Sequence, residues 1–204
     1  TNDGDETGPV NIVLTVTLST VNNTGVPITF EIDDLLTGSA TSGSDFTAIG
    51  PADQISIANA SSTGTYTIFV TDDPILESTE TVNVGISSPS DTDVSISTGS
   101  ISALIDDNDI ANADLSVTTT GNEAGPINIV YTVTLTAENG TGSPISFDFD
   151  DLLTGTALSG TDYTAVGGID QISVANGTNS GTYTIDITQD ALFEATETVN
   201  CRII

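Results

Sequence analysis

The chain has 204 residues, 37% of them hydrophobic, and its 29 aspartates and glutamates are accompanied by one basic residue, Arg202. This length suits one large domain or two of ordinary size, and the apolar fraction is sufficient for a folded core. A net charge of −28 argues against binding to nucleic acid or insertion at an anionic membrane, because phosphate groups need Lys and Arg partners. The same charge is expected to destabilise the compact state by self-repulsion, which makes bound metal ions the obvious source of countercharge.

The single cysteine, Cys201, excludes an internal disulfide framework and a cysteine-rich zinc site. No apolar run approaches 18 residues, so the sequence predicts no transmembrane helix, and no signal peptide is visible. The chain starts at Thr1 and contains no methionine. We therefore expect it to be an interior or processed piece of a longer protein.

The sequence consists of two copies of one pattern. Residues 4–13 return as residues 121–130, and the offset from Gly4 to Gly121 continues without a gap as far as Ile86 and Ile203. Roughly 60% of the residues are identical over the shared span, far beyond a chance self-match. We therefore predict a first repeat at residues 1–110 and a second at residues 111–204.

Within each repeat the hydrophobic period is two, as in Ile12, Leu14, Val16 and Leu18. This alternation is typical of half-buried strands, and no stretch of helix length has a period of 3.6. In the first repeat we expect strands at 10–18, 27–33, 55–57, 66–70, 82–86 and 96–105. Residues 34–52 are rich in Gly, Ser, Thr and Asp and predict a long loop. The fold class is therefore all-β, with an antiparallel β-sandwich of about seven strands per repeat.

Each repeat is expected to lack one strand. The second repeat opens with a strand at residues 113–118 whose counterpart would precede Thr1, and the strand ending at Ile105 has a counterpart that would follow Ile204. The first repeat thus lacks its first strand and the second its last. The chain is either cut from a longer array or completed by strands from neighbouring chains, since open sheet edges invite strand addition.

Carboxylates gather in three segments of the first repeat. Residues 105–109 follow a strand with three aspartates and an asparagine, the loop 71–80 has four acids, and Glu6 precedes another strand. In a sandwich these segments can all lie at one end, where they would supply the oxygen ligands that Ca²⁺ prefers. The alternative is a set of solvated acidic turns. The candidate ligands are Glu6, Asp72, Asp73, Glu77, Glu80, Asp106, Asp107 and Asp109.

Taken together, residues 38–46, 71–82 and 105–109 resemble the Calx-β domain family, and residues 155–163 and 190–199 repeat the first two of these motifs. The resemblance covers essentially the whole chain and implies two tandem immunoglobulin-like sandwiches. It also implies calcium ligands from the early Glu, the acidic loop before the sixth strand and the acidic run after the last strand. These positions are the eight residues named above and, in the second repeat, Glu123, Asp190, Glu194 and Glu197. Asp33 or Asp34 would substitute for an acid that the family often has before its Gly-Thr-Ala turn.

Several other residues have a structural interpretation. Asp45 and Asp162, each followed by an aromatic residue, are expected to fix turns. Tyr66 and Tyr183 are expected to pack in the core or across strands. Cys201 is expected to be a buried, inert thiol, because the chain has no His to activate it. Four asparagines begin Asn-x-Ser/Thr triplets and are either glycan acceptors or turn residues: Asn22, Asn59, Asn139 and Asn176.

The sequence therefore predicts a structural module of a long bacterial surface or secreted protein of the adhesin or stalk type, located outside the cell. Ca²⁺ would stiffen the junction between repeats, and the partners would be neighbouring repeats or identical subunits. The alternative is a subunit of an extracellular filament assembled by strand donation. We expect no enzymatic activity, because the acids lie in repeated loops and no tryptophan platform for a sugar is present.

Overall fold

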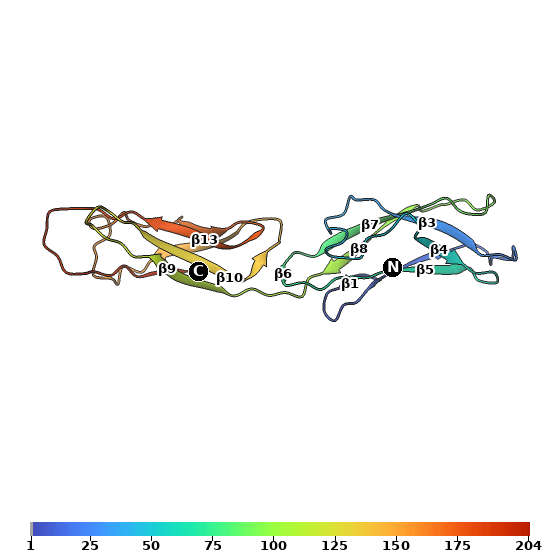
Figure 1. The fold of residues 1–204 in the computed structure, drawn as a ribbon, viewed down its shortest axis with the longest axis horizontal. Helices are drawn as coiled ribbons and strands as arrows, with labels where there is room; N and C mark the ends of the chain where they lie inside the picture. The colour runs from blue at the N-terminus through green and yellow to red at the C-terminus, as the bar shows by residue number, and fades with distance from the viewer. Residues whose placement is uncertain (1) are drawn as a thin grey trace. The chain divides into compact units, whose positions relative to one another are not determined.

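A computed structural model describes residues 2–204, and these residues form strands and connecting loops without a helix (Figure 1). No helix that could span a membrane is therefore present in this part of the chain. Contacts between residues divide the chain into two compact units. The first comprises Thr1–Pro74 and Ser78–Asn108, and the second comprises Ile75–Glu77 and Asp109–Ile204.

The first unit consists of a five-stranded sheet and a two-stranded sheet. The larger sheet has the order β1-β8-β7-β3-β4, and the smaller pairs β2 with β5. The strands are β1 (Gly4–Asp5), β2 (Ile12–Thr17), β3 (Ile28–Asp34), β4 (Gln54–Ile57), β5 (Thr63–Ile68), β7 (Glu80–Ser87) and β8 (Ser100–Asp106).

The second unit has two sheets of its own. One has the order β13-β10-β6, with β9 also paired to β10, and the other has the order β12-β11-β14. The strands are β6 (Ile75–Leu76), β9 (Ala113–Thr119), β10 (Ile129–Asn139), β11 (Ile145–Asp151), β12 (Gln171–Val174), β13 (Thr178–Ile185) and β14 (Cys201–Ile203).

The period of two in the sequence places one apolar face of each strand in a core. In β2, Ile12 and Leu14 are buried while the intervening Val13 is only partly so, and Ile12 lies opposite the buried Ile68 of β5. Each unit has a separate main cluster of buried side chains, centred on residues such as Phe46 in the first and Phe149 in the second. The predicted all-β fold with two tandem sandwiches is confirmed.

The structure corrects three details of the expected strands. The last strand of the first repeat starts at Ser100, and Ile96 lies in the preceding loop. The short strands β1 and β6 were not predicted, because two residues are too few to show a period. Both pair in parallel, β1 with β8 and β6 with β10, so the sheets are not purely antiparallel.

The predicted missing strands are confirmed within residues 2–204. β9 pairs with β10, but the equivalent edge of β2 has a single bridge, between Asn2 and Val13. β8 pairs with β7, whereas β14 pairs only with β11. Each repeat therefore shows where the absent strand of the other one belongs.

Two of the four Asn-x-Ser/Thr asparagines are buried turn residues. The side-chain amide of Asn22 is 3% exposed and donates to the carbonyls of Val26 and Ile57, at 2.9 and 3.0 Å. Asn139 repeats this arrangement in the second unit. The turn interpretation is confirmed for these two, whose nitrogens are engaged in the fold. Asn59 and Asn176 are exposed, and their side-chain carbonyls accept hydrogen bonds from the amides of Gly25 and Gly142, at 2.8 and 2.7 Å.

The turn before β5 contains a backbone position that suits glycine. Ala60 has a φ of 67°, and the equivalent Gly177 of the second repeat has a φ of 75° with no heavy atom near a Cβ position. A side chain in this left-handed region is strained. We predict that Ala60→Gly raises the free energy of unfolding by roughly 0.5–1 kcal/mol in urea titrations. Gly177→Ala is the matched control and should lower it, and a loss of stability in Ala60→Gly would contradict the prediction.

Candidate metal centre

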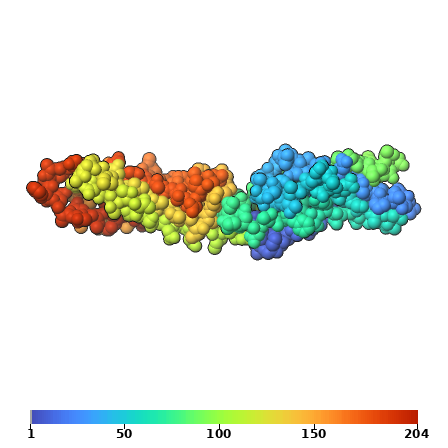
Figure 2. All heavy atoms as spheres, in the orientation of Figure 1, coloured from blue at the N-terminus to red at the C-terminus, as the bar shows by residue number. Residues whose placement is uncertain are grey.

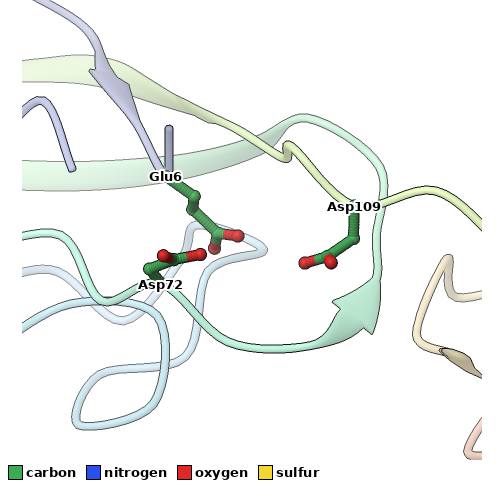
Figure 3. Close-up of side chains that lie close together, drawn as sticks. All are labelled: Glu6, Asp72 and Asp109. Atoms are coloured by element: carbon green, nitrogen blue, oxygen red, sulfur yellow. The ribbon is translucent and has the colours of Figure 1, made fainter. Parts of the chain in front are cut away.

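One group of carboxylates in the first repeat joins residues far apart in the sequence. Glu6, Asp72 and Asp109 each offer a carboxylate oxygen, and these oxygens lie within 4.8 Å of one another. Figure 3 shows the three side chains turned toward a common space. The backbone explains their proximity: β1 runs parallel to β8, and the amide of Glu6 donates to the carbonyl of Asp106 at 3.1 Å. The chain therefore brings Glu6 to the end of β8.

Burial raises the free-energy cost of keeping the carboxylates of this group ionised and close together. Glu6 is 2% exposed and Asp109 is partly buried, while Asp72 is exposed and accepts a hydrogen bond from the Asn108 side chain at 3.1 Å. Two carboxylates about 5 Å apart repel each other by about 3 kcal/mol at an effective dielectric constant of 20. A cation among the three oxygens would turn this repulsion into attraction.

A second group consists of Asp45, Glu77 and Glu80, whose carboxylate oxygens also lie within 4.8 Å of one another. Asp45 is 5% exposed, and its Oδ2 accepts a hydrogen bond from the Thr41 amide at 2.5 Å. The predicted turn-fixing role of Asp45 is thus confirmed, and the structure adds a place in an acidic cluster. The sequence did not predict that Asp45 belongs to this group, because a turn was a sufficient explanation for an aspartate at this position.

The second repeat reproduces this arrangement at equivalent positions. Asp162, Glu194 and Glu197 form a group of the same kind, and Asp162 Oδ2 accepts a hydrogen bond from the Leu158 amide at 2.6 Å. Another group combines Glu194 with Glu123 and Asp190. All four acids that the resemblance implied for the second repeat therefore lie in these clusters, within the part of the chain that is described.

Other candidate ligands lie outside the four groups. Asp73, Asp106 and Asp107 are not in any group found among residues 2–204. Asp106 instead accepts a hydrogen bond from the Thr79 hydroxyl at 2.9 Å. Asp33 and Asp34 are not brought to the clusters either, and Asp34 fixes its own turn by accepting from the Leu36 amide. They do not replace the acid that the family often has before the Gly-Thr-Ala turn.

The carboxylates of the second repeat perturb one another. Desolvation, followed by the charges of Asp162, Asp190 and Glu123, raises the pKa of Glu194 above its ordinary value. Desolvation and a hydrogen bond to Asp162 raise the pKa of Glu197, with further contributions from the charges of Asp162 and Glu194. The ionised cluster is therefore unfavourable by itself.

The remaining titratable candidates belong to the core. Cys201 is half-buried against the apolar cluster of the second unit, and burial raises the pKa of its thiol. Such a thiol is mostly protonated near neutral pH, in keeping with the predicted inert role. Tyr66 and Tyr183 pack against the two cores as predicted, and the Tyr183 hydroxyl donates to Asp170 at 2.7 Å.

The architecture and the sites define the chain as two acidic β-sandwich repeats with recurring carboxylate clusters. The family model described as Calx-beta domain matches it twice, over residues 2–109 and 106–203. The chain thus belongs to the Calx-beta domain family.

Solved structures similar to the chain include the crystal structure of CBD12 from CALX1.2, with 18% sequence identity and a TM-score of 0.42. The aligned region covers 90% of this chain and 71% of the CALX1.2 chain. Another is the crystal structure of the calcium binding domain CBD12 of CALX1.1, also with 18% sequence identity and a TM-score of 0.42. The aligned region covers 97% of this chain and 75% of the CALX1.1 chain. A search of curated protein sequences gave no match.

The raised pKa values predict an unusual pH dependence when divalent ions are removed. Because the pKa values of Glu194 and Glu197 lie above the unfolded-state value of about 4.3, the folded state binds more protons. In excess EDTA, the melting temperature should therefore rise as the pH falls from neutral through the folded-state pKa values. Calorimetry across this range tests the expectation. The double variant Glu194→Gln, Glu197→Gln should reduce the slope, and an unchanged slope would contradict the assignment.

Proposed function

We propose that the chain is a calcium-binding structural module of a long extracellular protein. The observation that carries the proposal is the recurrence of one carboxylate triad, Asp45, Glu77 and Glu80, at the equivalent positions of the second repeat. In the first repeat Asp45 is 5% exposed and both Glu77 and Glu80 are partly buried, which distinguishes this triad from a solvated acidic turn. The repulsion in such a triad is relieved when a cation binds.

The donor set favours Ca²⁺ over other metals. Every ligand candidate is a carboxylate, and the chain contains no His, so the nitrogen and sulfur ligands that zinc prefers are not offered by the clusters. Ca²⁺ accepts six to eight oxygen ligands in flexible geometry, whereas Mg²⁺ requires a nearly ideal octahedron and keeps several waters. Carboxylates contributed by loops, with water or backbone carbonyls completing the shell, suit the larger ion.

The bound ion would act by tying separate segments of the chain together. In the first repeat the ligands come from the residue after β1, the loop that follows β5 and the segment after β8. Asp109 directly precedes the linker 110–112. A cation held by Glu6, Asp72 and Asp109 would therefore restrain the chain where it leaves the first repeat, and would stiffen the junction.

The acidic composition and this chemistry support a location outside the cell, on the surface or in a secreted assembly of the adhesin or stalk type. Extracellular calcium modules typically have dissociation constants of about 0.1–1 mM, so they fill in tissue fluid or sea water. The partners proposed are further repeats of the same kind.

Calcium should raise the thermal stability of the chain selectively. At about 5 mM Ca²⁺, which is roughly ten times a dissociation constant of about 0.5 mM, we expect the melting temperature to exceed that in EDTA by several degrees. The same concentration of Mg²⁺ should have a smaller effect. Differential scanning calorimetry of the full chain provides the measurement. Equal midpoints with Ca²⁺ and EDTA would sink the proposal and leave the clusters as solvated turns.

Matched variants assign the effect to the clusters. Asp45→Asn with Glu80→Gln should reduce the calcium-induced shift in the first repeat, because both residues belong to one triad. Glu31→Gln removes a carboxylate from an exposed position of β3, outside the four groups, and should leave the shift unchanged. If Glu31→Gln reduced the shift as much, the effect would be general charge screening and not site binding.

The stiffening of the junction is a separate prediction. Asp109→Asn, made together with Glu6→Gln, should weaken calcium-dependent restraint of the linker while each repeat remains folded. Small-angle X-ray scattering in Ca²⁺ and in EDTA measures the spread of conformations. We expect the spread to narrow with Ca²⁺ in the natural chain and to stay broad in the variant, and a spread independent of Ca²⁺ would refute the stiffening role.

A further inference from the structure

The last residues of β10 pair with a segment that lies far away in the sequence. β6 runs parallel to β10, and its Leu76 lies opposite Asn139. One residue further along, the amide of Gly140 donates to the carbonyl of Leu76 at 2.8 Å. The contacts of Ile75–Glu77 assign this segment to the second unit, although the residues before and after it belong to the first. The loop between β5 and β7 therefore supplies a strand to the second unit.

The equivalent loop of the second repeat shows the same apolar dipeptide without a pairing partner. Leu192 and Phe193 correspond to Ile75 and Leu76 by the repeat offset. They lie outside any strand and are 66% and 108% exposed, whereas Ile75 and Leu76 are partly buried. This loop, between β13 and β14, appears in dark red at one end of the second unit (Figure 2). The loop sequence does not form a strand by itself, so the edge of β10 is what orders residues 75 and 76.

Gly140 is the residue that lets this segment approach β10. Its φ lies outside the left-handed region, so the backbone conformation at this position does not itself require a glycine. The available space does require one. A Cβ added at Gly140 would lie 2.5 Å from Cγ2 of Ile75 and 3.1 Å from both Cγ and Oε1 of Glu77. Because Cγ2 is bonded directly to Cβ of Ile75, a side chain at position 140 displaces β6 from its present place.

The first repeat has a side chain at the equivalent position of the same turn, where Asn23 replaces the glycine. The two turns are otherwise alike. The amide of Thr24 donates to Oδ1 of Asn22 at 3.1 Å, and the amide of Thr141 donates to Oδ1 of Asn139 at 3.1 Å. An asparagine after the buried Asn is thus compatible with the turn. It is the approach of a further strand that the asparagine obstructs.

From these observations we infer that the end of β10, residues 138–140, is a docking site for the apolar dipeptide in the loop after β5, and that Gly140 determines its specificity. A repeat of this kind with glycine at this position accepts the dipeptide as a short parallel strand, whereas a repeat with a side chain there refuses it. The docking site belongs to none of the carboxylate groups found in residues 2–204. Its pairing uses main-chain groups and needs no bound ion.

Gly140→Asn tests the inference with the residue that the first repeat already has in this turn. We expect the variant to keep the β10–β13 ladder, seen in NMR spectra, and to release residues 75 and 76 from β10. Cleavage by chymotrypsin after Leu76 measures the release, because the protease needs an extended, unpaired segment. In excess EDTA, this cleavage should accelerate at least about tenfold, as expected for the loss of one or more hydrogen bonds. Cleavage after the exposed Phe193 should keep its rate.

Two matched variants separate displacement of β6 from a general effect of substitution. Gly168→Ala adds a Cβ in the same unit at a place where no heavy atom lies within 4 Å. Asn23→Gly alters the equivalent turn of the first repeat. Both should leave the rate of cleavage after Leu76 unchanged. Equal cleavage after Leu76 in the natural chain and in a folded Gly140→Asn would overturn the inference, and so would an equal acceleration in Gly168→Ala.

Hydrogen exchange in the natural chain provides a test that does not depend on the folding of a variant. The Gly140 amide donates to Leu76 and should be protected. The Asn23 amide is the reference, since no hydrogen bond donated by it is found in residues 2–204. After correction for the intrinsic rate of each residue, we expect the Gly140 amide to exchange at least about tenfold more slowly in EDTA. Equal rates would mean that β6 does not pair with β10 in solution, which would contradict the inference whatever the outcome of calcium binding.

Discussion

Repulsion between carboxylates is the dominant electrostatic feature of this protein. Twenty-nine acidic side chains share one guanidinium, and that of Arg202 is already paired with Asp150 across the β14–β11 ladder at 3.1 Å. Protein cations therefore cannot neutralise the clusters around Glu6 or Asp45. The fold concentrates these acids in loops and strand ends, where hard cations can reach them, and keeps the strand interiors apolar. Under the proposed function, stability and metal binding would be coupled through the same few side chains.

The two repeats present the same triad in different surroundings. In the first, Glu80 belongs to β7 and lies opposite Ile105 of β8, so the sheet holds its position. In the second, the equivalent Glu197 precedes the short strand β14 and is exposed. A ligand fixed by a sheet loses less conformational entropy when the ion binds. The difference in backbone support therefore favours tighter binding by the first repeat.

The two units are completed by strands on either side of the boundary between the repeats. The segment from β8 to β9 completes a sheet in each unit, because β8 pairs with β7 and β9 pairs with β10. A repeat is complete when it has a strand of each type.

The repeat, the all-β class and most strands could be predicted from the amino-acid pattern, because alternation such as Ile12, Leu14 and Val16 indicates which side chains are buried. It also identified most of the acids that gather into clusters, since dense carboxylates are conspicuous, but it assigned Asp45 and Asp162 to turns alone. Only the tertiary structure decided which acids meet. The parallel pairing of β1 with β8 brings Glu6 to Asp109, and the turn at Asp45 meets Glu77 and Glu80, while Asp73, Asp106 and Asp107 stay outside the groups. Such encounters depend on strand register and loop paths, and these are set by packing between segments distant in sequence, which no local pattern records.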